Sequence, residues 1–289
     1  MSEFSKIPTK KHGRNLVWND EFHGKSIDAS KWSTEPLMFN SALVYDNSEK
    51  NLRINNNLLH LQVNRVEDKF STCNSVTTKH TMLFRYGYVE MRAKLPFRHG
   101  AWASFWLKSD TPFLRSKANR NNWFSEIDIF ELFAKSDEVC ANIHRWGNKS
   151  GETWREMLPD VVDGKPRNFK FKNSENLVNE FHTYGMLWDE HSIKFYVDDE
   201  MYLDVPIDER STFNNATCND VMGFHDPHYL IINNEVFTEN LRWYPKGSAI
   251  TPDEEMPIDY FVDYVRLYQD DNKDMIYIGD FFKKNNNLK

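Results

Sequence analysis

Several short segments of the chain alternate between apolar and polar residues, which is the pattern of half-buried β-strands. The alternation is clear over residues 59–64, 88–95 and 192–198. In the second segment one face would carry the four apolar side chains Val89, Met91, Ala93 and Leu95. The turn Asp198-Asp199 predicts a hairpin to a further strand at 201–205, and a last strand is predicted at 260–268.

Helical periodicity is scarce, and only residues 28–31 and 112–118 predict short helices. Two stretches without clear periodicity, 108–122 and 148–170, are long for plain connectors. Loops of that length are usually functional or mobile.

Many short strands separated by Asn, Asp, Gly and Pro are typical of a β-sandwich or barrel. A chain of 289 residues has the length of one large all-β domain. We therefore expect a single domain over residues 1–289, with 1–14 and 280–289 at its periphery.

Three acids, Glu126, Asp128 and Glu131, lie within one apolar, aromatic-rich run that predicts a strand. Because strand side chains alternate, Ile127 and Ile129 would share one face, and the first two acids would share the other. Glu131 breaks this alternation. One extra residue near positions 129 and 130, a β-bulge, would return Glu131 to the side of the other acids.

Three converging carboxylates suit the hydrolysis of a glycosidic bond. That reaction needs one ionised carboxylate and one protonated carboxylic acid on either side of the same bond. Crowding of like charges separates pKa values and so supplies both protonation states. The alternative is an acidic strand edge that is solvated or paired with Lys and Arg.

Composition excludes several classes of function. The net charge of −7 and the absence of a basic stripe argue against nucleic acid as a partner. Three widely spaced cysteines, Cys73, Cys140 and Cys218, predict neither a disulfide framework nor a zinc site. No apolar stretch reaches the ~18 residues of a membrane span. Residues 1–14 lack the apolar region of a signal peptide.

Aromatic residues make up 15% of the chain, which is more than a core needs, so some rings are expected to face a ligand. Six segments in order resemble glycoside hydrolase family 16, the laminarinase, agarase and porphyranase group. They are residues 16–22, 28–32, 86–96, 102–107, 181–198 and 262–268, and the bulged acid motif of residues 126–131 is similar to that of the family. The resemblance implies a β-jelly-roll sandwich of two antiparallel sheets with an open substrate cleft on the concave face.

The resemblance also implies roles for single residues. Glu126 would be the nucleophile of a retaining endo-β-glycosidase, Glu131 its general acid/base, and Asp128 the residue that tunes and orients the nucleophile. Trp102 and Trp106 match aromatic residues of the family's cleft, with Trp102 as the sugar platform and Trp106 as a core residue.

His144 stands where the family has a histidine, which would bond the acid/base or a sugar; the alternative is a structural histidine. The sequence departs from laminarinases at 231–237, where Glu235 resembles the galactan-cleaving branches and would add a cleft acid. Ala103 replaces a common Pro of the paired-Trp segment. Both differences favour a β-galactan (agar, porphyran or keratan-like) substrate over the alternative, a β-1,3-(1,4)-glucan.

Many relatives hold a structural calcium ion, and Glu21 and Asp263 match its acidic ligands, whereas catalysis needs no cofactor. Asp263 would share a strand face with Phe261, Val265 and Leu267 and so needs a partner, which Arg266 or a backbone amide could also supply. The resemblance further implies a monomer, and a secreted, periplasmic or cell-surface location with the signal peptide absent from this sequence; the cytoplasm stays open. A transglycosylase and a non-catalytic sugar-binding protein on the same fold remain as alternatives.

Overall fold

The computed structural model describes residues 7–37, 40–96, 98–109, 124–133, 138–149, 152–171, 180–207, 224–225, 227–239, 247–271 and 275–276. This part of the chain is all-β and contains no helix. Nearly all strand pairs are antiparallel, the exception being β3 with β6. The predicted fold class, an all-β jelly-roll sandwich, is thereby confirmed.

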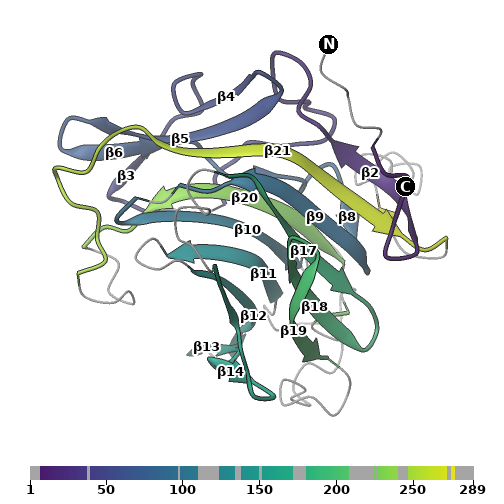
Figure 1. Ribbon diagram of the computed structural model, residues 1–289. Coiled ribbons are helices and arrows are strands. Elements are labelled where there is room, and N and C mark those ends of the chain that lie inside the picture. Colours follow the sequence, from purple (N-terminus) through teal and green to yellow (C-terminus); the bar gives the residue numbers. More distant parts are fainter. Residues whose placement is uncertain are drawn as a thin grey trace, which may run out of the picture.

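The larger sheet has eleven strands. Its main order is β19 (Glu200–Pro206), β18 (Ser192–Val197), β17 (His182–Trp188), β9 (Gly87–Lys94), β21 (Ile258–Gln269), β5 (Leu58–Val66), β6 (Lys69–Thr72) and β3 (Leu43–Tyr45), with β1 (Lys10–Lys11), β2 (Arg14–Asp20) and β4 (Leu52–Asn55) paired at its side. Figure 1 shows β21 running across this sheet.

The smaller sheet has nine strands and contains the three predicted acids. Its main order is β13 (Glu152–Met157), β12 (Glu138–Lys149), β11 (Phe124–Phe133), β10 (Ala101–Ser109), β20 (His228–Val236), β8 (Leu83–Phe84) and β22 (Met275–Ile276), with β7 (Val76–Thr77) and β16 (Asn168–Lys170) at its side. A separate hairpin joins β14 (Val161–Val162) to β15 (Lys165–Pro166).

One continuous apolar core lies between the two sheets. The predicted alternation of β9 is confirmed, because Val89, Met91 and Ala93 all face this core. The smaller sheet contributes Phe105 and Ile127, among others. Acidic and aromatic side chains therefore occupy the opposite face of the smaller sheet. We call it the acid face and define it by Glu126, Asp128 and Glu131.

Two local predictions were wrong, and others lie on residues that the structure does not describe. Residues 28–31 form a single hydrogen-bonded turn, with the amides of Lys31 and Trp32 both bonded to the Asp28 carbonyl, and no helix. The stretch 148–170 is not one long loop, because it contains β13 to β16. The predicted helix at 112–118, the loop beyond Ser109 and Cys218 lie outside the described residues.

The predicted face of Asp263 was wrong. The register of β21 against β9 shifts between Val262 and Tyr264, so that Asp263 is the extra residue of a bulge. The core face continues with Val265, whereas Asp263 is half-exposed and accepts a hydrogen bond from Arg92. A bulge reverses the alternation of every residue after it, and the apolar pattern alone did not reveal this one.

Candidate active site

The predicted β-bulge is present in β11. Against β12, Asp128 pairs with Asn142 and Glu131 pairs with Cys140, so β11 holds one residue more than β12 between these pairs. Ile129 and Phe130 are consecutive, yet both lie in the core. Two core-facing residues in a row return Glu131 to the acid face.

The register of the neighbouring strands surrounds each acid with specific side chains. Glu126 lies between Lys108 of β10 and His144 of β12. Asp128 lies beside Trp106, and Glu131 lies beside Ser104. Directly opposed residues on adjacent strands are close enough to interact, so these pairs set the electrostatics of the site. Lys108 and Ser104 were not singled out from the sequence, because only the strand register identifies them.

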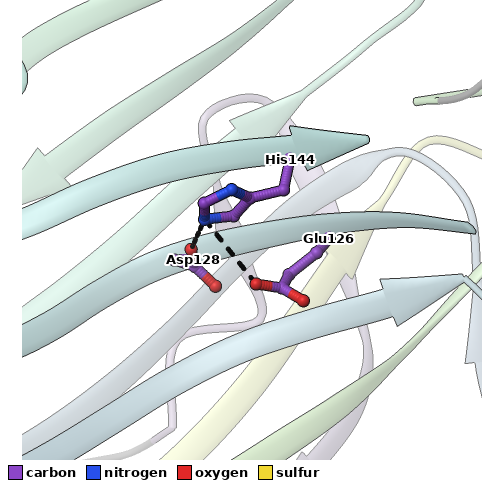
Figure 2. A group of neighbouring side chains, drawn as sticks. All are labelled: Glu126, Asp128 and His144. Carbon is purple, nitrogen blue, oxygen red and sulfur yellow. Dashed lines mark ion pairs between the residues drawn. The ribbon is translucent and has the colours of Figure 1, made fainter. Parts of the chain in front are cut away.

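His144 contacts the first two acids. Its Nε2 lies 3.1 Å from Asp128 Oδ2 and 3.6 Å from Glu126 Oε1. Figure 2 shows the imidazole reaching from one strand over both carboxylates. Of the predicted acid partners, His144 therefore pairs with Asp128 and Glu126, and a bond to a sugar stays a prediction. The ring is 5% exposed, which fits a residue that orients these carboxylates.

Glu126, Asp128 and His144 also form the one group of three potential metal ligands found within the described residues, with donor atoms within 4.8 Å of one another. The distance of 3.1 Å between His144 Nε2 and Asp128 Oδ2 is that of an ion pair. We interpret the group as an ion-paired cluster of one imidazole and two carboxylates rather than as a metal site.

Burial and crowding raise the pKa of two acids. Burial is the largest cause at Glu126, and the charge of Asp128 adds to it, so that its pKa rises to about 8. The same two causes raise the pKa of Glu131 to about 8. The charge of His144 acts in the opposite direction on both. Because the groups interact, they titrate as one coupled set that can hold a proton near neutral pH.

The two predicted tryptophans occupy the acid face in different ways. Trp102 is half-buried, and its indole Nε1 donates a hydrogen bond of 3.0 Å to Glu131 Oε1. Trp106 is buried, as expected, but not in the main core. It belongs to a small cluster on the acid face with Leu83, Tyr229 and Ile231. Of the two, only Trp102 is open enough to contact a sugar.

Glu235 also lies on the acid face, opposite Trp102 on β20. The side chain is 2% exposed, and its Oε1 accepts a hydrogen bond of 3.2 Å from the hydroxyl of Tyr45. Its Oε2 has no hydrogen-bond partner among the described residues. Burial is the main cause that raises its pKa to about 7. Tyr45 was missed, because a contact across 190 positions leaves no local signal in the sequence.

The predicted calcium ligands are both engaged by arginines. Glu21 accepts two hydrogen bonds, of 2.9 and 2.8 Å, from Arg266. Asp263 accepts one of 2.5 Å from Arg92. A cation at either carboxylate would have to displace a guanidinium of the same charge sign. These two side chains, as they are arranged, do not fit a calcium site.

Comparison with known proteins identifies the family. The model for glycosyl hydrolases family 16 matches residues 39–223. The glucan endo-1,3-β-glucosidase A1 of Niallia circulans is 26% identical in an alignment of 283 positions that covers 89% of this chain and 38% of that protein. The β-glucanase of Rhodothermus marinus is 28% identical over 262 residues, covering 88% of this chain and 85% of that protein.

A solved structure from work on endo-acting O-glycanases, which prominent human gut bacteria express to initiate mucin breakdown, superposes with a TM-score of 0.67. It is 28% identical and covers 91% of this chain and 93% of that one. The present chain thus spans nearly the whole of some relatives but only about two fifths of the Niallia protein. A family model that matches well over half of the chain establishes membership, so this chain belongs to glycosyl hydrolases family 16 and is a glycoside hydrolase.

Proposed function

We propose that the chain is a retaining endo-β-glycosidase in which Glu126 is the nucleophile and Glu131 the general acid/base. The observation that carries the proposal is the bulge of β11, which brings Glu131 to the face that already holds Glu126 and Asp128. A purely structural strand gains nothing from three acids on one face, because each raises the cost of ionising the next.

In the first step, the ionised carboxylate of Glu126 attacks the anomeric carbon, and the glycosidic bond breaks. Glu131 gives its proton to the leaving oxygen. A covalent glycosyl ester on Glu126 results. In the second step, Glu131 takes a proton from water, the resulting hydroxide attacks the anomeric carbon, and Glu126 leaves as a carboxylate. Configuration at the anomeric carbon is retained after the two displacements.

Asp128 and His144 have supporting roles in this proposal. The charge of Asp128 raises the pKa of both Glu126 and Glu131, which favours one shared proton over none. His144, which forms ion pairs with Asp128 and Glu126, holds both carboxylates in position. The nucleophile and the general acid are therefore already oriented when the substrate binds.

A β-galactoside backbone is the substrate that we favour. Glu235 is a buried acid beside Trp102, at the position where the sequence departs from laminarinases. The similarity to a structure from work on endo-acting O-glycanases that initiate mucin breakdown supports a substrate other than a glucan. A β-1,3-glucan is the second candidate, and the two glucanase relatives favour it. Either polymer is too large to cross a membrane, so we propose a site of action outside the cytoplasm.

A polysaccharide panel with product sizing tests the proposal. It contains laminarin, mixed-linkage glucan, agarose, porphyran, keratan-type chains and mucin O-glycans. We expect oligosaccharides early in the digest of a galactoside polymer, with little monosaccharide. Hydrolysis of laminarin alone would overturn the substrate choice but leave the mechanism intact. Release of monosaccharide alone would overturn the endo assignment, and inactivity on every polymer would overturn the proposed function.

A further inference from the structure

Trp102 and Glu131 lie on neighbouring strands but are not directly opposed. Ser104 is opposite Glu131, and Phe133 is opposite Trp102, so the indole reaches Glu131 along the diagonal of the ladder. The bond from its Nε1 to Glu131 Oε1 is 3.0 Å long. Glu131 is half-buried, which makes a directed donor at this carboxyl group more consequential than it would be in water.

The indole ring is held in place by aromatic packing. It stacks on Phe237 with a centroid distance of 4.8 Å and an interplanar angle of 15°. Phe237 in turn packs against Phe133 at 5.8 Å. Phe237 is buried, with 1% of its surface exposed. A ring clamped in this way presents its N–H in one direction, so the donor is aimed at a single oxygen of Glu131.

A protonated carboxyl group has one hydroxyl oxygen and one carbonyl oxygen. An N–H group bonds best to the carbonyl oxygen, so the donor at Oε1 favours the tautomer with the proton on Oε2. We propose that Trp102 is a positioning residue that fixes the acidic proton of Glu131 on Oε2, the oxygen that serves the leaving group. The inference rests on the proposed function and deepens it, because it assigns the atom that transfers the proton.

The same bond changes strength during the reaction. When Oε2–H gives its proton to the glycosidic oxygen, Glu131 becomes a carboxylate, and an N–H bond to a carboxylate is stronger than one to a neutral acid. Trp102 therefore stabilises the charge that develops on Glu131 in the transition state. In the second step, Oε2 takes the proton back from water, while Oε1 stays bonded to the indole.

Two consequences follow from the loss of the N–H group. The bond to Trp102 lowers the pKa of Glu131 against the larger upward effects of burial and Asp128, so its removal must raise that pKa further. Proton transfer to the leaving oxygen must also become slower. A role as a sugar platform alone predicts neither effect, because it depends on the ring face and not on the N–H.

The test removes the N–H but keeps an aromatic ring. Trp102→Phe is one variant, and replacement of Trp102 by 3-benzothienylalanine, which has the same shape and no N–H, is the second in case phenylalanine packs poorly. Trp32→Phe is the matched control, because Trp32 Nε1 donates a similar bond of 2.8 Å to Asp20 in the core. The probes are aryl β-lactosides and β-laminaribiosides with leaving groups from 2,4-dinitrophenol to 4-methoxyphenol.

We expect both Trp102 variants to lose about tenfold or more in kcat/KM on the 4-methoxyphenyl glycosides, which need acid assistance, and less than about threefold on the dinitrophenyl glycosides. The Trp32→Phe control should show the leaving-group dependence of the wild type. Equal losses on both leaving groups, or none on either, would overturn the positioning role.

A second readout needs no turnover. The side-chain carboxyl carbons are followed by ¹³C NMR across pH, with Glu131 identified through Glu131→Gln. We expect the midpoint of Glu131 to rise by about half a unit or more in both Trp102 variants and to stay in place in Trp32→Phe. An unchanged midpoint would contradict the proposal. If the wild type cleaves no probe and no polymer, the proposed function fails, and this titration alone still decides the role of Trp102.

Discussion

The carboxylates of the two sheets have different kinds of partners. On the outer side of the larger sheet, Glu21 binds Arg266, Asp263 binds Arg92, and the buried Glu90 binds Lys11 at 2.5 Å. On the acid face of the smaller sheet, acids lie beside other acids, a histidine and an indole, and the pKa of two of them rises to about 8.

This difference separates acids that stabilise the fold from acids that can take part in proton transfer. A carboxylate paired with a guanidinium or ammonium group fixes the chain through charge-assisted hydrogen bonds. A buried carboxyl beside like charges retains its proton and costs folding free energy. Acids of the second kind persist where their chemistry is needed.

The largest expected effect comes from removal of the two catalytic carboxylates. Glu126→Ala and Glu131→Ala should each lower kcat on a polymer by about 10⁴-fold or more, with the fold intact by circular dichroism. Azide should partly rescue Glu126→Ala by taking the place of the nucleophile and giving a glycosyl azide of inverted configuration. Near-normal turnover by either variant would remove the assignment.

The comparison predicts opposite stability effects for two charge-removing substitutions. Glu21→Gln breaks a pair whose side chains are 15% and 8% exposed, so the free energy of unfolding should fall by about 1–3 kcal/mol. Glu131→Gln should raise it by about 1–3 kcal/mol at pH 8, because a neutral amide avoids the cost of ionisation. Denaturant titration measures both, and a destabilised Glu131→Gln would contradict the account.

The pH dependence of stability follows from the same pKa values. The folded-state pKa of Glu126 and Glu131 is raised from 4.5 to about 8, so between these values the folded protein holds protons that the unfolded chain has lost. Their contribution is present below pH 4.5 and is lost as pH rises to about 8. Thermal unfolding should therefore start at a lower temperature at pH 9 than at pH 6. A Glu126→Gln, Glu131→Gln variant is the control, and it should show only a smaller decrease of the midpoint, due to Glu235, whose pKa is raised to about 7.

Activity should follow a bell-shaped curve in pH. The acidic limb reports ionisation of the nucleophile, and the alkaline limb reports loss of the last proton from the coupled acids. Because burial and crowding raise both pKa values, the optimum of kcat/KM should lie near neutral pH rather than near pH 4.5. A flat profile across this range, with chemistry shown to be rate-limiting, would contradict the assignment.

The smallest expected effect concerns Glu235. Glu235→Gln keeps the size of the side chain but removes the group whose pKa is raised to about 7. If this acid selects a galactoside, kcat/KM should fall by about 10-fold on a galactan and by less than about threefold on laminarin. Tyr45→Phe removes the hydroxyl bonded to Glu235. It should also lower kcat/KM more on the galactan than on laminarin, but by a smaller factor. Equal losses on both polymers would remove Glu235 from substrate selection.

The sequence predicted the bulge of β11 for a physical reason. The three acids can share one face and the two isoleucines the other only if the strand has one extra residue near Ile129. The structure has that extra residue. The bulge at Asp263 could not be predicted in the same way. Without a bulge, Phe261, Val265 and Leu267 form an acceptable apolar alternation, so the pattern did not require an interruption. In the structure, Val262, Val265 and Leu267 face the core instead.

Sequence patterns could not predict the contacts between side chains of different strands. Trp106 is buried by Leu83 and Ile231 on the acid face, and that cover depends on which strands are neighbours. Tyr45 meets Glu235 because β3 and β20 belong to different sheets that approach one another. Alternation identifies the face of a side chain, whereas only the strand order and register identify its neighbours.

The most direct test of the central claim is to trap the covalent intermediate. The wild-type chain is incubated with 2,4-dinitrophenyl 2-deoxy-2-fluoro β-lactoside or β-laminaribioside, which slow the second step, and the labelled peptide is identified by mass spectrometry. The account predicts one sugar per chain, esterified to Glu126, and no label in Glu126→Ala. A label on Glu131 or Asp128, or fast turnover of the natural polymer by an enzyme that never forms the ester, would contradict it.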